Sequence, residues 1–185
     1  SNPTMEAESI LLREFLGVKD DNRRNKLARH IIGMQRSDGT WGQFYGAPGD
    51  LSTSTECYFA LKLSGYSHQE PFMRKARDFI LSKGGVPNTR VFTKIWLALF
   101  GQWDWRGLPI LPPELMMLPS WFPISLYDFA SWARATIVPM IILFERKPIR
   151  PLPESLHIDE IYPLTRSETD FSIKRPKRLI GWDSF

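Results

Sequence analysis

Side chains that could act as metal ligands or nucleophiles are few in this chain of 185 residues, and they lie far apart. The separations of its three histidines, His30, His68 and His157, do not match the spacing of a metal site, so no metal is expected. The single cysteine, Cys57, precedes the apolar run 58–61, which predicts a buried and inert thiol. One cysteine cannot form an intrachain disulfide, which favours a reducing compartment.

Aromatic side chains are abundant instead. The chain is 43% hydrophobic and 13% aromatic, with seven tryptophans and twelve phenylalanines, and this composition excludes a disordered chain. Its 24 basic and 20 acidic residues are mixed along most of the sequence and give a net charge of +4. A nucleic-acid-binding protein would concentrate its basic residues, so no nucleic-acid partner is expected. The dense basic stretch 174–178 is interpreted as a solvated tail.

The opening residues 1–4 are polar and are followed at once by Glu6 and Glu8, so no signal peptide is predicted. No apolar run approaches the roughly 20 residues that span a bilayer. The chain is therefore expected to be soluble or to lie on a membrane surface. The irregular apolar stretch 115–124 fits either a loop packed under the domain or a membrane-facing surface.

Helices are the elements that must position these side chains. Apolar residues recur at helical spacing, and breaks at glycine and proline separate the helices. The predicted ranges are 1–16, 21–35, 52–63, 70–81, 88–100, a short helix at 114–118, and 125–145, which Pro139 should kink or split. No segment shows strand alternation. The fold class is therefore all-α, and the likeness of segments 27–32 and 75–80 indicates helical-hairpin repeats.

Three parts are expected along the chain. Residues 1–16 form an N-terminal helix that can pack on a domain outside this sequence. Residues 17–150 form the helical domain itself. Residues 151–185 contain prolines among polar residues and are predicted to be an extended connection.

The segment from Gln35 to Trp41 carries the most specific local pattern, Gln35-Arg36-Ser37-Asp38-Gly39-Thr40-Trp41. The Gln35 amide can hydrogen-bond free backbone groups at the end of its helix. Gly39 permits the turn, and Trp41 can then stack back and cover the helix end. This pattern resembles the QW repeat of prenyltransferase-like α/α barrels, where it is a structural clasp.

Four further segments resemble bacterial squalene-hopene cyclases, and they occur in the same order. They are the segment 46–56 with the following 58–62, and the segments 88–96, 112–115 and 131–136. The resemblance runs from about Glu6 to Pro153. It implies part of an α/α barrel of the terpene cyclase type, built of helical hairpins.

The same resemblance implies an isomerase of the intramolecular transferase or lyase kind. Such an enzyme converts squalene to a hopanoid-type pentacycle by acid-initiated cationic cyclisation, without a cofactor. Its proton donor lies in a D-x-D-D motif, which segments 19–21 and 158–160 do not match. The chain is thus expected to be part of a cyclase and inactive alone, with the rest of the cyclase or a second subunit as partner. The family also implies monotopic attachment to the cytoplasmic side of the membrane, and it leaves a homodimer open.

Eleven residues take their roles from the resemblance. The substrate cavity would be lined by Trp132, Phe92 and Trp96, and a polar cluster that orders water at its end would consist of Glu8, Glu56 and Arg90. The channel constriction would be formed by Phe129 and Ile137, and the structural motif by Gln35, Gly39 and Trp41. Positions 129, 132 or 133, and 137 would share one face of a helix.

Other interpretations stay open. Glu8, Glu56 and Arg90 could be ordinary exposed charges, and the aromatic residues could pack in a core. A related cyclase could act on oxidosqualene or on a shorter polyprenyl chain. A non-catalytic helical-repeat module that binds a partner or a hydrophobic ligand would also fit a chain without D-x-D-D.

Overall fold

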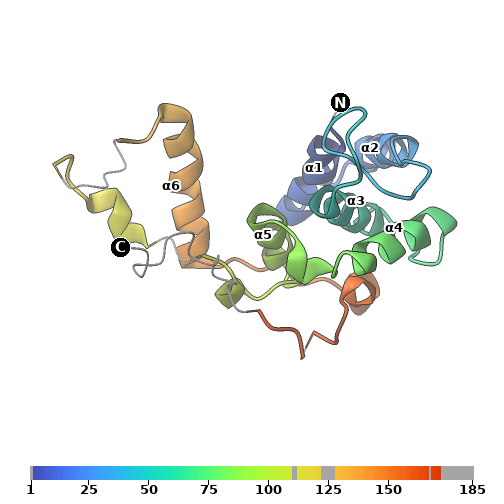
Figure 1. Cartoon of the computed structure of the whole chain (residues 1–185). Helices are drawn as coiled ribbons and strands as arrows, with labels where there is room; N and C mark the ends of the chain where they lie inside the picture. Colours follow the sequence, from blue (N-terminus) through green and yellow to red (C-terminus); the bar gives the residue numbers. More distant parts are fainter. Residues whose placement is uncertain (1, 110–111, 122–127, 167, 172–185) are drawn as a thin grey trace, which may run out of the picture.

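The computed structural model describes residues 2–109, 112–121, 128–166 and 168–171. Within these ranges the chain is helical and contains no strand, so the all-α prediction is confirmed. The α-helices are α1 (Pro3–Leu16), α2 (Asp21–Gly33), α3 (Leu51–Leu63), α4 (Pro71–Ser82), α5 (Val91–Leu99) and α6 (Ser131–Arg146) (Figure 1). Short 3₁₀ turns lie at Val86–Asn88, Trp105–Gly107, Pro113–Met117, Glu154–Leu156 and Asp159–Ile161.

Helix α3 lies at the centre of the helical body. Every residue from Ser52 to Leu63 is buried, including the polar residues of its first turns. A helix that is buried on all sides must be covered by neighbours on all sides. Helices α1, α2, α4 and α5 all contact it (Figure 1). Side chains that project from α3 therefore reach the surfaces where these helices meet.

Helix α1 packs on α3 and α2 through its apolar face, with Ala7, Ile10 and Leu11 buried. Asn2 caps its first turn by accepting a hydrogen bond from the Thr4 backbone N–H at 3.0 Å. Its opposite face is exposed at Met5, Leu12 and Leu16. The prediction that residues 1–16 also pack on a further domain concerns this second face, and it stays a prediction.

Two helices, α5 and α6, begin at least three residues later than the sequence predicts. Helix α5 begins at Val91 rather than 88, because residues 86–88 form a 3₁₀ turn first. Helix α6 begins at Ser131 rather than 125, and residues 122–127 lie outside the described part of the chain. Pro139 does not split α6, which continues to Arg146. Figure 1 shows α6 standing beside the body formed by α1 to α5.

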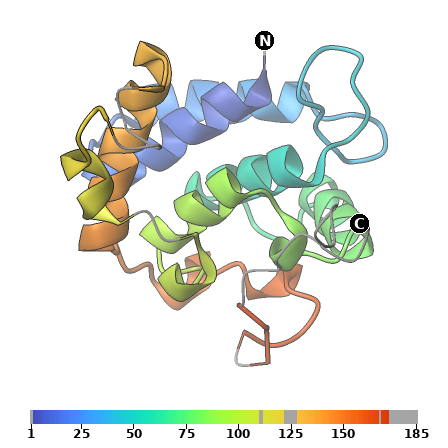
Figure 2. The same ribbon diagram turned by 60° about the vertical axis from the view of Figure 1, so that its left-hand side comes forward.

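The segment after α6 returns along the body under α5 toward α4 (Figures 1 and 2). It buries Ile158, Ile161 and Tyr162 in the core, although the sequence predicted only an extended connection there. Buried polar contacts fasten it: Lys62 of α3 donates to the His157 carbonyl and pairs with Glu160. The described residues of this segment thus pack against the core and shield it from solvent.

Candidate functional site

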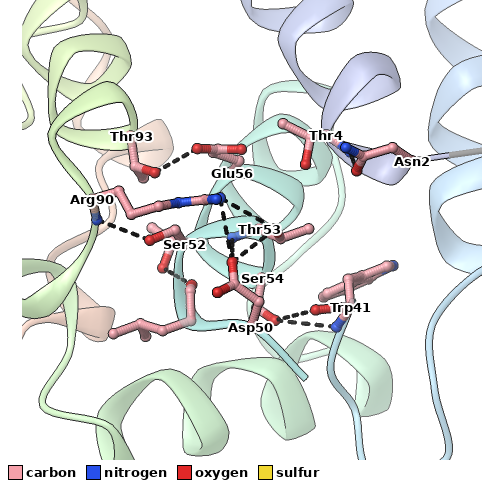
Figure 3. Close-up of polar contacts among 12 residues, drawn as sticks. Asn2, Thr4, Trp41, Asp50, Ser52, Thr53, Ser54, Glu56, Arg90 and Thr93 are labelled. Atoms are coloured by element: carbon pink, nitrogen blue, oxygen red, sulfur yellow. Dashed lines mark hydrogen bonds and ion pairs between the residues drawn. The ribbon is translucent and has the colours of Figure 1, made fainter. Parts of the chain in front are cut away.

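Glu56 is the buried carboxylate of the site. It lies in the second turn of α3 and is 3% exposed. The Thr93 hydroxyl of α5 donates a hydrogen bond to its Oε1 atom (Figure 3). Its Oε2 atom is buried and accepts no hydrogen bond from the residues that the structure describes. A buried carboxylate oxygen without a donor is costly, so this atom is a natural position for a water or a proton.

Burial raises the pKa of Glu56 from its ordinary 4.5 to about 7, because the charged form loses hydration. The hydrogen bond from Thr93 opposes this shift. The charges of Glu8 and Asp50 add to it, whereas that of Arg90 opposes it. Glu56 therefore exchanges a proton near neutral pH, which is where a general acid or base works best.

Arg90 makes its ion pair with Asp50, and not with either predicted carboxylate. Its guanidinium Nη2 lies 3.3 Å from Asp50 Oδ1 and donates to the Thr53 hydroxyl at 3.4 Å (Figure 3). Its backbone N–H donates to the Ser52 hydroxyl at 2.9 Å, which fixes the start of α5 against α3. The Arg90 side chain is exposed, with 46% of its surface open to solvent.

Asp50 is the N-cap of α3, and its Oδ1 atom accepts hydrogen bonds from the Thr53 backbone N–H and hydroxyl, both at 2.8 Å. Desolvation opposes ionisation, but these bonds and the charge of Arg90 hold the pKa of Asp50 below its usual value. Asp50 is therefore an anion at neutral pH. Asp50 was not among the predicted site residues, although an aspartate directly before a helix is an N-cap signal.

Glu8 of α1 joins the same region. Its Oε1 atom accepts a hydrogen bond from the Trp96 indole N–H at 3.2 Å, and Glu8 is half-buried. The structure thus brings the three predicted polar residues together between α1, α3 and α5. They differ in burial, with Glu56 buried, Glu8 half-buried and Arg90 exposed. Reading all three as ordinary exposed charges is wrong for Glu56.

The predicted cavity aromatics lie mostly outside the core. Phe92 is 60% exposed and Trp132 is 76% exposed, so neither packs in the core that the described residues form. Trp96 is half-buried and packs against the core. Phe129 precedes the first residue of α6, so the shared helix face cannot include it. Ile137 lies on α6 and is half-buried.

The loop that follows α2 ties three helices together. The Gln35 side-chain amide donates to the Gly39 carbonyl at 2.9 Å and to the Phe72 carbonyl of α4 at 3.0 Å. The fully buried Trp41 donates from its indole N–H to the Ile31 carbonyl near the end of α2 at 2.7 Å. Gly39 has φ of 83°, in the left-handed region that favours glycine.

This loop also reaches the polar site. The Asp50 backbone N–H donates to the Trp41 carbonyl at 2.9 Å, and the Ser54 hydroxyl accepts from the Trp41 N–H at 3.1 Å (Figure 3). The loop therefore fixes the start of α3, where Asp50 holds Arg90.

Two kinds of feature are absent from the residues that the structure describes. No group of three histidine, cysteine, aspartate or glutamate side chains there could hold a metal ion. In the same part of the chain, none of the helices combines the length and apolarity needed to cross a membrane.

These features define an all-helical protein with a buried carboxylate of raised pKa and exposed aromatic rings. The family model of the squalene-hopene cyclase N-terminal domain matches residues 1–185. The chain belongs to this family.

Individual relatives agree with this assignment. The chain is 46% identical to a squalene–hopene cyclase of Alicyclobacillus acidocaldarius over 95% of its length, which is 27% of that relative. It is 43% identical to a dammaradiene synthase of Dryopteris crassirhizoma over 87% of its length, which is 24% of that relative. A squalene–hopene cyclase of Zymomonas mobilis is 40% identical over 88% of the chain and 25% of its own length.

The chain thus spans about a quarter of the length of these relatives. Another relative is a squalene hopane cyclase of Aspergillus fumigatus. Because the relatives come from such different organisms, family membership does not decide the bacterial origin that the sequence analysis inferred.

Proposed function

We propose that the chain is one part of a bacterial-type triterpene cyclase that converts squalene to a hopanoid-type pentacycle. The observation that carries this proposal is the match to squalene-hopene cyclases over almost the whole chain. The chain supplies part of the cavity wall and the polar cluster of Glu8, Glu56 and Arg90. The initiating acid belongs to the rest of the cyclase or to a second subunit, so the chain alone is inactive. Because the reaction is started by an acid, it uses no cofactor.

The exposed aromatic rings support the cavity role. A carbocation is stabilised by the electron-rich face of an aromatic ring, and the ring does not trap it as a nucleophile would. Phe92 and Trp132 are large apolar side chains left open to solvent, which is costly unless another surface or a substrate covers them. We assign them, with Trp96, to the wall that contacts the polyene, and Phe129 and Ile137 to the channel constriction.

The polar cluster serves the end of the reaction. The last cation either loses a proton or takes up water, and both steps need a group that accepts a proton. Glu56 has a pKa near 7 and a free Oε2 atom. Glu8 places a second carboxylate beside it. Together they can order a water molecule by charge-assisted hydrogen bonds.

The substrate also suggests the location. Squalene is a hydrocarbon that dissolves in lipid, so a monotopic cyclase on the cytoplasmic side of the membrane would meet it there. Met117 is 84% exposed and Trp121 is 80% exposed. Exposed apolar side chains at these positions support a membrane-facing surface more than a loop packed under the domain. A homodimer is compatible with this arrangement.

The test is to express the full-length protein that contains this chain and supply it with squalene. Chromatography with mass spectrometry should find a pentacyclic product. Replacing Trp132 with alanine should reduce the product at least tenfold, and the matched variant Trp132→Phe should retain most of it, because it keeps a ring face. A folded full-length protein that leaves squalene and oxidosqualene unchanged would refute the cyclase assignment.

A related cyclase with another product is the second candidate. The 43% identity to a relative named dammaradiene synthase favours it, since that name denotes another product. The same assay separates the candidates by the product that forms and by the preferred substrate, whether squalene, oxidosqualene or a shorter polyprenyl chain.

A further inference from the structure

Two residues that the family resemblance does not single out hold the members of the polar cluster in place. Thr93 is fully buried, and its hydroxyl donates to Glu56 Oε1. Asp50 binds the Arg90 guanidinium at 3.3 Å. Both contacts join segments about 40 positions apart, so they are features of the folded chain and not of a local motif.

The Thr93 contact makes the two oxygens of Glu56 unequal. Oε1 accepts a hydrogen bond from the Thr93 hydroxyl, whereas Oε2 is buried and has no donor among the described residues. A carboxyl group carries its proton on the oxygen that does not already accept a hydrogen bond. Thr93 therefore selects Oε2 as the atom that takes up a proton or binds water.

The Asp50 contact controls the nearest cation. Arg90 alone would stabilise the ionised form of Glu56 by its charge. Asp50 pairs with Arg90 and adds a negative charge that acts in the opposite direction. The other titratable neighbours that act on the same region are Glu8 from α1 and the buried thiol of Cys57 on α3 itself.

We propose that Thr93 and Asp50 are positioning residues for the final step of the cyclisation. The hydrogen bond from Thr93 occupies Oε1 of Glu56 and leaves Oε2 to take up the proton. The ion pair with Asp50 keeps Arg90 from pairing with Glu56. In that step a C–H bond beside the cationic carbon breaks, and its electrons form the alkene. The proton passes to Oε2 directly or through one water and leaves Glu56 neutral. This proposal rests on the proposed function.

The test uses the full-length protein and follows the ratio of alkene to alcohol product against pH. Initiation affects both products equally, so the ratio isolates the last step. Deprotonation needs ionised Glu56, so the alkene share should rise with pH around a midpoint near 7. Asp50→Asn keeps the helix cap but removes the charge, and it should move this midpoint down by about one pH unit.

Thr93→Val removes the hydroxyl and should move the midpoint up, because the ionised form loses a hydrogen bond. Thr93→Ser restores the donor and should keep the wild-type midpoint. Opposite shifts in two variants cannot come from general damage, which lowers the yield without moving a midpoint. If Thr93→Val does not fold, Thr93→Ala removes the same hydroxyl and should move the midpoint in the same direction; an unchanged midpoint would overturn the role of Thr93.

The two proposals fail differently. A wild-type protein that forms no cyclic product removes the basis of both. A wild-type protein that cyclises squalene, with a product ratio that Asp50→Asn leaves at the same midpoint, overturns the positioning roles and leaves the cyclase assignment intact.

Discussion

Replacing Glu56 with glutamine should remove most of the pH dependence of this chain's stability between about pH 5 and pH 8.5. The folded chain binds a proton at Glu56 more tightly than the unfolded chain does, because burial raises the pKa from 4.5 to about 7. The resulting stability is fully present below pH 4.5 and is lost as the pH rises through 7. At about 1.36 kcal/mol for each pH unit, the wild type loses about 3 kcal/mol.

The assay is urea unfolding of the 185-residue chain, followed by tryptophan fluorescence at several pH values. The readout is the change of the unfolding free energy with pH and not its absolute value. The glutamine amide can place N–H donors where Oε2 lay, which lowers the stability of the variant by the same amount at every pH. Asp50 and Glu160 have lowered pKa values and act at more acidic pH, so they do not disturb this window.

A matched variant, Glu8→Gln, keeps Glu56 but removes a neighbouring charge that raises its pKa. Its stability should fall with pH around a lower midpoint than that of the wild type. If Glu56→Gln and the wild type lose stability in parallel over the whole window, Glu56 is already ionised at pH 5, and both its burial and its proposed role as a base near neutral pH are refuted.

Two further substitutions test the core. Lys62→Met should cost about 3 kcal/mol of unfolding free energy, because it leaves the Glu160 carboxylate without its buried cation, and the double change with Glu160→Gln should recover more than half of the loss. Gly39→Ala should cost at least about 2 kcal/mol, since its φ is 83° and the new methyl would lie 2.4 Å from Lys75 Cβ. Gly33→Ala is its control: it is helical with open space around it, and it should stabilise the chain by about 0.5 kcal/mol. Urea midpoints check all of these variants, and a Gly39→Ala variant as stable as the wild type would contradict the tight approach of α4.

Helices were predictable where the signal is local. Helix α3 ends at the predicted residue, Leu63, because Gly65 marks its end, and it begins within one residue of its prediction. The start of α6 was predicted less well: the helix begins at Ser131, and residues 128–130 before it are not α-helical. The burial of all sides of α3 was also beyond the sequence, since Ser52, Thr53 and Glu56 are polar and only their partners on other helices explain them.

The polar cluster shows the same limit. The family resemblance implied that Glu8, Glu56 and Arg90 form one cluster that orders water, and it named no partner for Arg90. The structure instead gives Arg90 to Asp50, which lies 40 positions earlier in the chain. A guanidinium pairs with the carboxylate that geometry brings nearest, and sequence spacing does not contain that distance. Family resemblance located the region, and only the fold assigned the partners.

The return of the chain after α6 was missed for a related reason. Its prolines and polar residues have no periodicity, so nothing local predicted that Ile158 and Ile161 would be buried. What fixes this segment is a contact between Lys62 and Glu160, 98 positions apart, with the Tyr58 hydroxyl donating to the same carboxylate at 2.7 Å. A lysine inside an apolar helix was the one available signal, because such a side chain needs a buried anion.

The loop from Gln35 to Trp41 links the structural and chemical parts of the molecule. Its Trp41 carbonyl accepts a hydrogen bond from the Asp50 N–H, and Asp50 forms an ion pair with Arg90. The charges of Asp50 and Arg90 both act on Glu56. A substitution that loosens Trp41 should therefore do more than destabilise the fold. By letting Asp50 move, it should release Arg90 toward Glu56 and lower the pKa of that carboxyl, so damage to a structural residue should appear as a change in the acid–base behaviour of the site.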